Sequence, residues 1–104
     1  MDQIHAPERV RAIRESAAAN MRSVVDLEAR MQDPYFRGRL EQIRHGLEDV
    51  EGFFLGSLTR ESRTPAQECT WLDYAEIALA IAVRQLKAIQ DAVAKFGPNV
   101  ATAG

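Results

Sequence analysis

The sequence is poor in features that would place the protein outside the cell or in a membrane. Its 104 residues include one cysteine, Cys69, so no internal disulfide can form and nothing points to an oxidising compartment. The first residues have neither a basic segment nor an apolar run, so we expect no signal peptide. The longest apolar run is seven residues, 77–83, whereas a membrane-spanning helix needs ~20. We therefore expect a cytoplasmic protein with no membrane partner.

An excess of charge of one sign is also missing. The formal net charge is −2, and no run of like charges exceeds two residues. Because nucleic-acid-binding domains normally carry a basic excess, we expect no nucleic-acid partner. Arginine outnumbers lysine by 11 to 2, which we interpret as the codon bias of a GC-rich bacterial genome.

The residues that are present favour helices. Aromatic residues make up 7% of the chain, whereas alanine, leucine, glutamate and arginine are plentiful and favour helix over strand. Proline follows a capping residue at Asp33 and at Thr64, which is typical of helix starts. Glu68 lies one residue beyond the position of a capping-box partner for Thr64. A Gly-Pro pair at 97–98 is typical of a helix end.

Apolar residues recur at alternating steps of three and four along three segments, the spacing that keeps one stripe of a helix facing its neighbours. The first stripe is Val10, Ile13, Ala17, Asn20, Val24, Leu27 and Met31; the second is Phe36, Leu40, Ile43, Leu47, Val50 and Phe54, with Leu58 just off register; the third is Leu72, Ala75, Leu79, Ala82, Leu86, Ile89, Val93 and Phe96. No segment alternates with the two-residue period of a strand.

We therefore expect an all-α fold of three long antiparallel amphipathic helices, near 7–31, 34–59 and 65–96, that form a helical bundle with coiled-coil packing. The whole chain, 1–104, is predicted to be a single domain whose ends, 1–6 and 98–104, are flexible. The polar link at 59–64 either turns the chain back or kinks it, and the sequence leaves both open.

The third helix carries a second apolar set, roughly opposite its core stripe. A helix that is apolar nearly all round is buried on both sides, so it is either central to the packing or covered by another molecule. We expect a homodimer, because an exposed apolar stripe invites aggregation and two-fold dimers are the commonest small oligomers. The alternative is that the link or the N-terminal residues cover this surface. The predicted interface residues are Trp71, Tyr74, Ile77 and Ile81.

Three further positions in the predicted helices are unusual. Gly52 and Gly56 lie four residues apart, at a combined cost of about 1–2 kcal/mol relative to alanine. They indicate a close helix crossing, a fraying helix end, or a ligand groove beside Phe53 and its neighbour. Asn20 interrupts the first stripe: it either fixes register in the core or reaches water while Met21 takes its place.

The polar side chains that could carry chemistry have ordinary explanations. Glu41, His45 and Glu48 share one helical face, but it points away from the core stripe, so we interpret it as a solvated ion-pairing face rather than a metal site. Cys69 has no histidine near it in sequence to act as a base, so we expect a buried structural cysteine. We predict no catalytic residue, no metal and no cofactor.

Two short segments are similar to phosphotransfer motifs. His45 and Leu47 resemble the motif of histidine-containing phosphotransfer domains, but two acids follow where that family has lysine and glycine. Residues 59–65 resemble the dimerisation box of histidine kinases, with Arg60 in place of the phosphorylated histidine. The matching residues of that box are Glu61, Arg63, Thr64 and Pro65. Both segments therefore lack the chemistry of the families they resemble.

The function that the sequence favours is a non-catalytic bacterial module for protein interaction or regulation, which acts through helical surfaces. The alternative is a small helical enzyme, or a bundle that binds a ligand or metal, with a pocket between subunits. That alternative covers a degenerate phosphotransfer protein and a chorismate-mutase type of enzyme. The latter would recruit Arg11, Arg14 and Arg22 of the first helix into its pocket.

Overall fold

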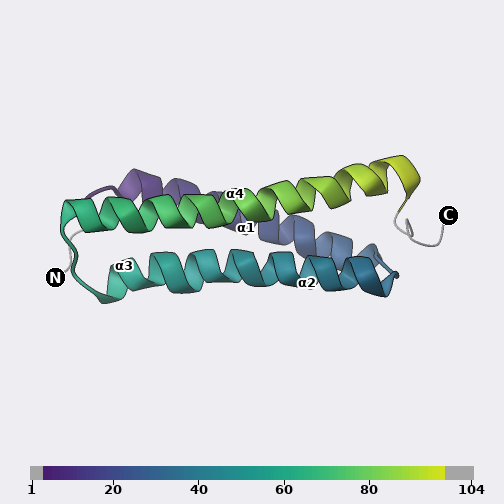
Figure 1. Cartoon of the computed structure of the whole chain (residues 1–104), viewed down its shortest axis with the longest axis horizontal. Coiled ribbons are helices and arrows are strands. Elements are labelled where there is room, and N and C mark those ends of the chain that lie inside the picture. Colours follow the sequence, from purple (N-terminus) through teal and green to yellow (C-terminus); the bar gives the residue numbers. More distant parts are fainter. Residues whose placement is uncertain (1–3, 98–104) are drawn as a thin grey trace.

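The computed structural model describes residues 4–97, which form helices and short connections and contain no strand. In chain order the elements are α1 (Pro7–Arg30), α2 (Pro34–Asp49), the π-helical segment η1 (Val50–Leu55), α3 (Gly56–Arg60) and α4 (Pro65–Phe96). Because α2, η1 and α3 follow one another without a break, the chain has three helical rods (Figure 1). The expected all-helical class is confirmed, and each helix boundary lies within one residue of its predicted place.

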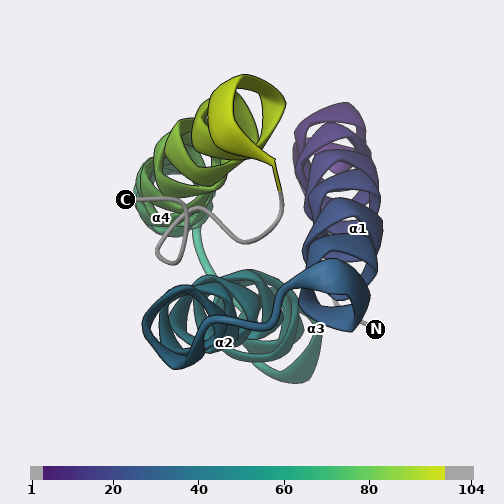
Figure 2. The same ribbon diagram turned by 90° about the vertical axis from the view of Figure 1, so that its right-hand side faces the viewer.

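The three rods lie side by side, and the chain reverses direction at both links (Figure 1). Seen end-on, α1, α2 and α4 stand at the corners of a triangle, and each contacts the other two (Figure 2). The molecule is correspondingly slender, with dimensions of 54 × 18 × 16 Å. The link between α3 and α4 is a turn, which decides between the two alternatives that the sequence left open.

Two of the helix starts are capped as the sequence predicts, with one correction. The side chain of Asp33 accepts two backbone N–H groups of the first turn of α2, at 2.9 and 3.2 Å. Thr64 and Gln67 form a reciprocal capping box at the start of α4, with distances of 3.1 and 3.0 Å. The partner of Thr64 is therefore Gln67 and not Glu68, because the box needs the third residue of the helix.

Glu68 instead caps a different helix. The start of α1 has no side-chain cap of its own. The carboxylate of Glu68, only 3% exposed, accepts the backbone N–H of His5 at 2.9 Å and that of Ala6 at 2.8 Å. Ile4 and Ala6 also pack against the core beside it. One buried carboxylate thus ties the start of α1 to the first turn of α4; the remaining predicted flexible residues, 1–3 and 98–104, lie outside the described part.

The core divides into two clusters along the molecule. One contains Val24, Leu27, Met31, Leu40, Ile43, Leu47, Ala82, Leu86 and Ile89, and the other contains Val10, Ile13, Ala17, Val50, Leu55, Leu58, Leu72 and Ala75. Nearly all of these residues belong to the predicted stripes. Some residues of the predicted stripes lie outside these clusters. Asn20 is half-buried and its side chain donates a hydrogen bond to the carbonyl oxygen of Ser16 in its own helix, at 2.8 Å, while Met21 packs against the core. Phe96 lies at the end of α4 and is exposed.

The π-helical segment η1 corrects the register of the second rod. A π-turn holds one residue more than an α-turn, so the stripe after Val50 continues at Leu55 instead of Phe54. Leu58, which the α-helical period places off register, is thereby brought into the core and is 4% exposed. Phe54 is left half-buried at the edge of the core.

The glycines of this rod do not make a close helix crossing. A Cβ atom on Gly52 would meet nothing within 4 Å, and one on Gly56 would meet only atoms of its own helix segment, chiefly the side chain of Arg60. The rod also continues to Arg60, so it does not fray at the glycines. Both of these interpretations of the glycine pair are wrong for the described chain.

We expect Glu68→Ala to lower the free energy of unfolding by about 1–3 kcal/mol, because two backbone N–H groups lose their acceptor. Urea denaturation followed by circular dichroism measures the change. The matched control is Gln90→Ala, an exposed position on the same helix, which should stay within about 0.5 kcal/mol of the native protein. Equal midpoints for the two variants would show that Glu68 does not hold the start of α1.

Gly52→Ala should raise the free energy of unfolding by about 0.4–1 kcal/mol, because the backbone has a negative φ and the added methyl group meets open space. Gly97→Ala is the opposite control: its φ of +88° and ψ of 172° strain an alanine, so stability should fall by about 1–3 kcal/mol. Thermal unfolding of both variants tests the pair. A loss of stability in Gly52→Ala would contradict the open geometry around η1.

Candidate interaction face on α4

Three of the four residues predicted as an interface lie on the exposed side of α4, and Trp71 packs against the edge of the core. Tyr74, Ile77 and Ile81 are 53%, 56% and 51% exposed, and Trp71 is half-buried at their edge. No segment within residues 4–97 covers the three exposed side chains. The described residues before α1 are held by Glu68, and the α3–α4 link reaches only Trp71, through Arg63. The alternative, that the chain itself hides this surface, is wrong for the described residues.

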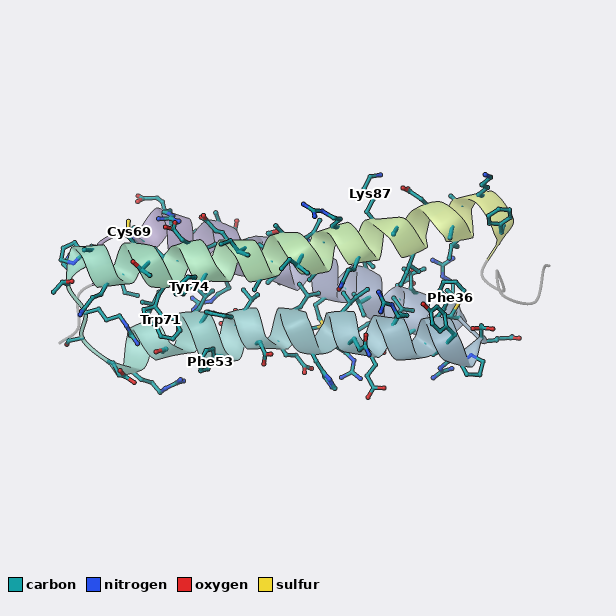
Figure 3. The ribbon with its side chains drawn as sticks, viewed as in Figure 1. Phe36, Phe53, Cys69, Trp71, Tyr74 and Lys87 are labelled. Carbon is teal, nitrogen blue, oxygen red and sulfur yellow. The ribbon has the colours of Figure 1, made fainter. Side chains whose placement is uncertain are left out.

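Aromatic side chains from two rods meet at one end of this surface (Figure 3). The ring of Trp71 lies 5.5 Å from that of Phe53, 5.8 Å from that of Phe54 and 6.5 Å from that of Tyr74. Phe53 is itself 54% exposed, so η1 extends the surface beyond α4. We call the five residues Phe53, Trp71, Tyr74, Ile77 and Ile81 the α4 face. Sequence analysis identified four of them and treated Phe53 only as the wall of a groove.

Arg63 holds Trp71 from the side of the link. Its guanidinium lies 4.8 Å from the centre of the indole ring and donates to the carbonyl oxygen and the hydroxyl of Ser57, at 2.8 and 2.6 Å. The Arg63 side chain is only 10% exposed, so these contacts are largely shielded from water. The indole is therefore fixed in place while part of it remains accessible.

Arg9 forms ion pairs with two acidic side chains at the border of the α4 face. Its guanidinium binds Asp73 at 2.9 Å and Glu76 at 2.8 Å, which draws both carboxylates toward α1. The hydrogen bonds that Arg9 donates to Glu76, and then to Asp73, raise the pKa of Arg9 above its usual value. The two acids next to Ile77 along α4 are thus neutralised on the far side of the helix, and the α4 face keeps an apolar surface.

Cys69 is exposed, which contradicts the expectation of a buried structural cysteine. Its sulfur atom lies 3.6 Å from a guanidinium nitrogen of Arg9, on the side of α4 that faces α1 at the surface. Helical period places Cys69 off the core stripe, but which flank of α4 meets α1 is a tertiary property. Burial was therefore inferred from residue type alone, and residue type was misleading here.

The other polar candidates lie on the surface. Glu41, His45 and Glu48 are exposed, and Glu48 lies 3.5 Å from Arg44 in an i,i+4 ion pair. No three His, Cys, Asp or Glu side chains within residues 4–97 are grouped so that they could hold a metal ion. The three arginines suggested for a chorismate-mutase type of pocket are exposed, and Arg14 pairs with Glu51 at 2.9 Å.

No protein-family model matches the chain, and neither a curated protein nor a solved structure matches it. None of the helices in the described range is both long and apolar enough to cross a membrane. The buried charged side chain of the described core, Glu68, has both carboxylate oxygens occupied by backbone N–H groups. The α4 face is thus the structural feature from which a function has to be argued.

Replacing Arg63 tests how Trp71 is held. We expect Arg63→Ala to lower the free energy of unfolding by about 1–3 kcal/mol, because the buried Ser57 loses two charge-assisted hydrogen bonds. Emission of Trp71, the only tryptophan, should shift to the red as water reaches the ring. Arg60→Ala removes an exposed arginine three residues earlier and should change neither quantity. Identical spectra for the two variants would contradict the contact.

Proposed function

We propose that the protein is a non-catalytic bacterial module for protein interaction or regulation, which self-associates through the α4 face and acts in the cytoplasm. The observation that carries the proposal is the exposure of Tyr74, Ile77 and Ile81, each more than half accessible on one stripe of the longest helix. Contiguous apolar surface of this kind typically marks an interaction site. Monomeric chains rarely leave such surface in water.

The energetics favour association of moderate strength. Because each of the three side chains is about half exposed, its burial contributes roughly 1 kcal/mol. A two-fold axis doubles the contribution, since the same residues of both copies are buried together. The accessible aromatic surface of Phe53 and Trp71 adds to it, while loss of translational freedom opposes it. The proposal therefore implies a dimer whose population depends on protein concentration.

The surroundings of the α4 face suit a helical partner surface. Arg9 engages the neighbouring acids, so no unpaired carboxylate of the first turns of α4 has to be desolvated when a partner packs there. The partner in this proposal is the same face of a second copy. Two α4 helices then pack against each other, and the three-helix bundle of each chain is completed by the other.

The double variant Ile77→Glu with Ile81→Glu should remain helical and lose the dimer, because four carboxylates would have to be buried at the two-fold interface. Sedimentation velocity over a range of concentrations gives the mass, and circular dichroism gives the helicity. Emission of Trp71 should shift to the blue with concentration in the native protein and stay constant in the variant.

The matched control is Val25→Glu, which places the same charge at a 52% exposed apolar residue on α1, away from the α4 face. This variant should keep the native mass. A native protein that sediments as a monomer at every concentration would overturn self-association. Native mass spectrometry of the same sample also reports a small molecule retained by the dimer and absent from the monomer, the mark of the alternative with a pocket between subunits.

A further inference from the structure

A second feature lies between α2 and α4, beyond the α4 face and toward the start of α2. It is a cleft of about 340 Å³ whose walls come from both helices. Phe36 and Ile43 of α2 and Ile89 of α4 supply its apolar lining. Tyr35 stands at the cleft, 66% exposed, with its ring edge-on to Phe36 at 5.1 Å. The volume is at the lower end of the range for small-molecule sites.

Two arginines line this cleft from opposite helices. Arg39 belongs to α2 and Arg84 to α4, both are exposed, and neither forms an ion pair with an acid among residues 4–97. No Asp or Glu lines the cleft. Five other arginines have a carboxylate within 3.5 Å, namely Arg9, Arg14, Arg30, Arg44 and Arg63. Within residues 4–97, Arg11, Arg22, Arg37 and Arg60 form no ion pair either.

An apolar cleft lined by two guanidinium groups without acidic partners suits a ligand that has both an anionic group and an apolar part. An anion bound at this lining would be attracted by both guanidinium groups. Guanidinium groups bind carboxylates through paired, charge-assisted hydrogen bonds. The apolar side chains around Phe36 and Ile89 can cover a hydrocarbon chain, and Gln85 and Tyr35 are the uncharged polar side chains of the lining.

We propose that this cleft binds a small amphiphilic carboxylate, with its carboxylate between Arg39 and Arg84 and its hydrocarbon part along Phe36, Ile43 and Ile89. The site is contained within one chain, so it does not depend on the dimer proposed above. It is also distinct from the α4 face, with which it shares no residue. Charge complementarity makes an organic anion the occupant, in preference to a neutral or cationic one.

The test uses the full chain and three probes of equal chain length: octanoate, octan-1-ol and octylamine. Isothermal titration calorimetry should show octanoate binding at least tenfold more tightly than the alcohol, and no binding of the ammonium ion. In nuclear magnetic resonance spectra of ¹⁵N-labelled protein, octanoate should shift the amide signals of Arg39, Ile43, Arg84 and Ala88. Equal affinity for octanoate and octan-1-ol would overturn the proposal.

Substitutions test whether the two arginines bind the carboxylate of octanoate. Arg39→Gln and Arg84→Gln should each weaken octanoate binding by roughly tenfold, as expected for loss of a hydrogen bond to a charged group. Arg84→Lys should lie in between, because it keeps the charge but loses the paired geometry. The control is Arg22→Gln, an exposed arginine of α1 with no ion pair in the described chain, which should bind as the native protein does. Unchanged affinity in both cleft variants also contradicts the site.

Discussion

The fold depends on one constraint: each of three helices has to hide a single apolar stripe against the other two. A triangle of rods satisfies this constraint with two core clusters along its axis, and it leaves the outer side of every rod in water (Figure 2). Apolar side chains beyond the stripe therefore have no place inside one chain. The α4 face follows directly, because Tyr74, Ile77 and Ile81 occupy the side of α4 that the triangle does not cover.

Polar contacts distinguish the two ends of the molecule. Glu68, Arg63 and Arg9 all act within the first turns of α4, where they fix the start of α1, hold Trp71 and engage two neighbouring acids. The α4 face begins at this well-tied end. Toward the opposite end, Arg39 and Arg84 border a cleft without carboxylate partners. The molecule thus carries an apolar surface at its most constrained end and unbalanced positive charge nearer the other.

Local signals in the sequence predicted most of the fold. The proline that follows Asp33 and Thr64 marks two helix starts to the residue, since capping is decided within a few positions of the chain. The exposed residues that α4 contributes to this face could be predicted because their helical angle is a property of the sequence alone, whereas Phe53 comes from another rod.

What the sequence did not reveal depends on distant residues. Glu68 binds backbone groups more than 60 positions away, and Cys69 lies beside Arg9 on another helix, so no nearby residue signals either environment. The π-turn has no local code of its own; it follows from the need to bury Leu55 and Leu58 after Val50. Arg39 and Arg84 resemble ordinary solvated arginines until the two helices bring them to one cleft.

The π-turn also determines how the second rod responds to the loss of one residue. The turn at η1 absorbs one surplus residue, so the rod on either side keeps the same face toward the core. A chain shorter by one residue between Val50 and Leu55 would restore a regular α-helical spacing with both flanking core contacts intact. We therefore expect the second rod to accommodate a single-residue deletion there, whereas the same deletion within α1 or α4 would rotate the later side chains of that helix by about 100° relative to their partners.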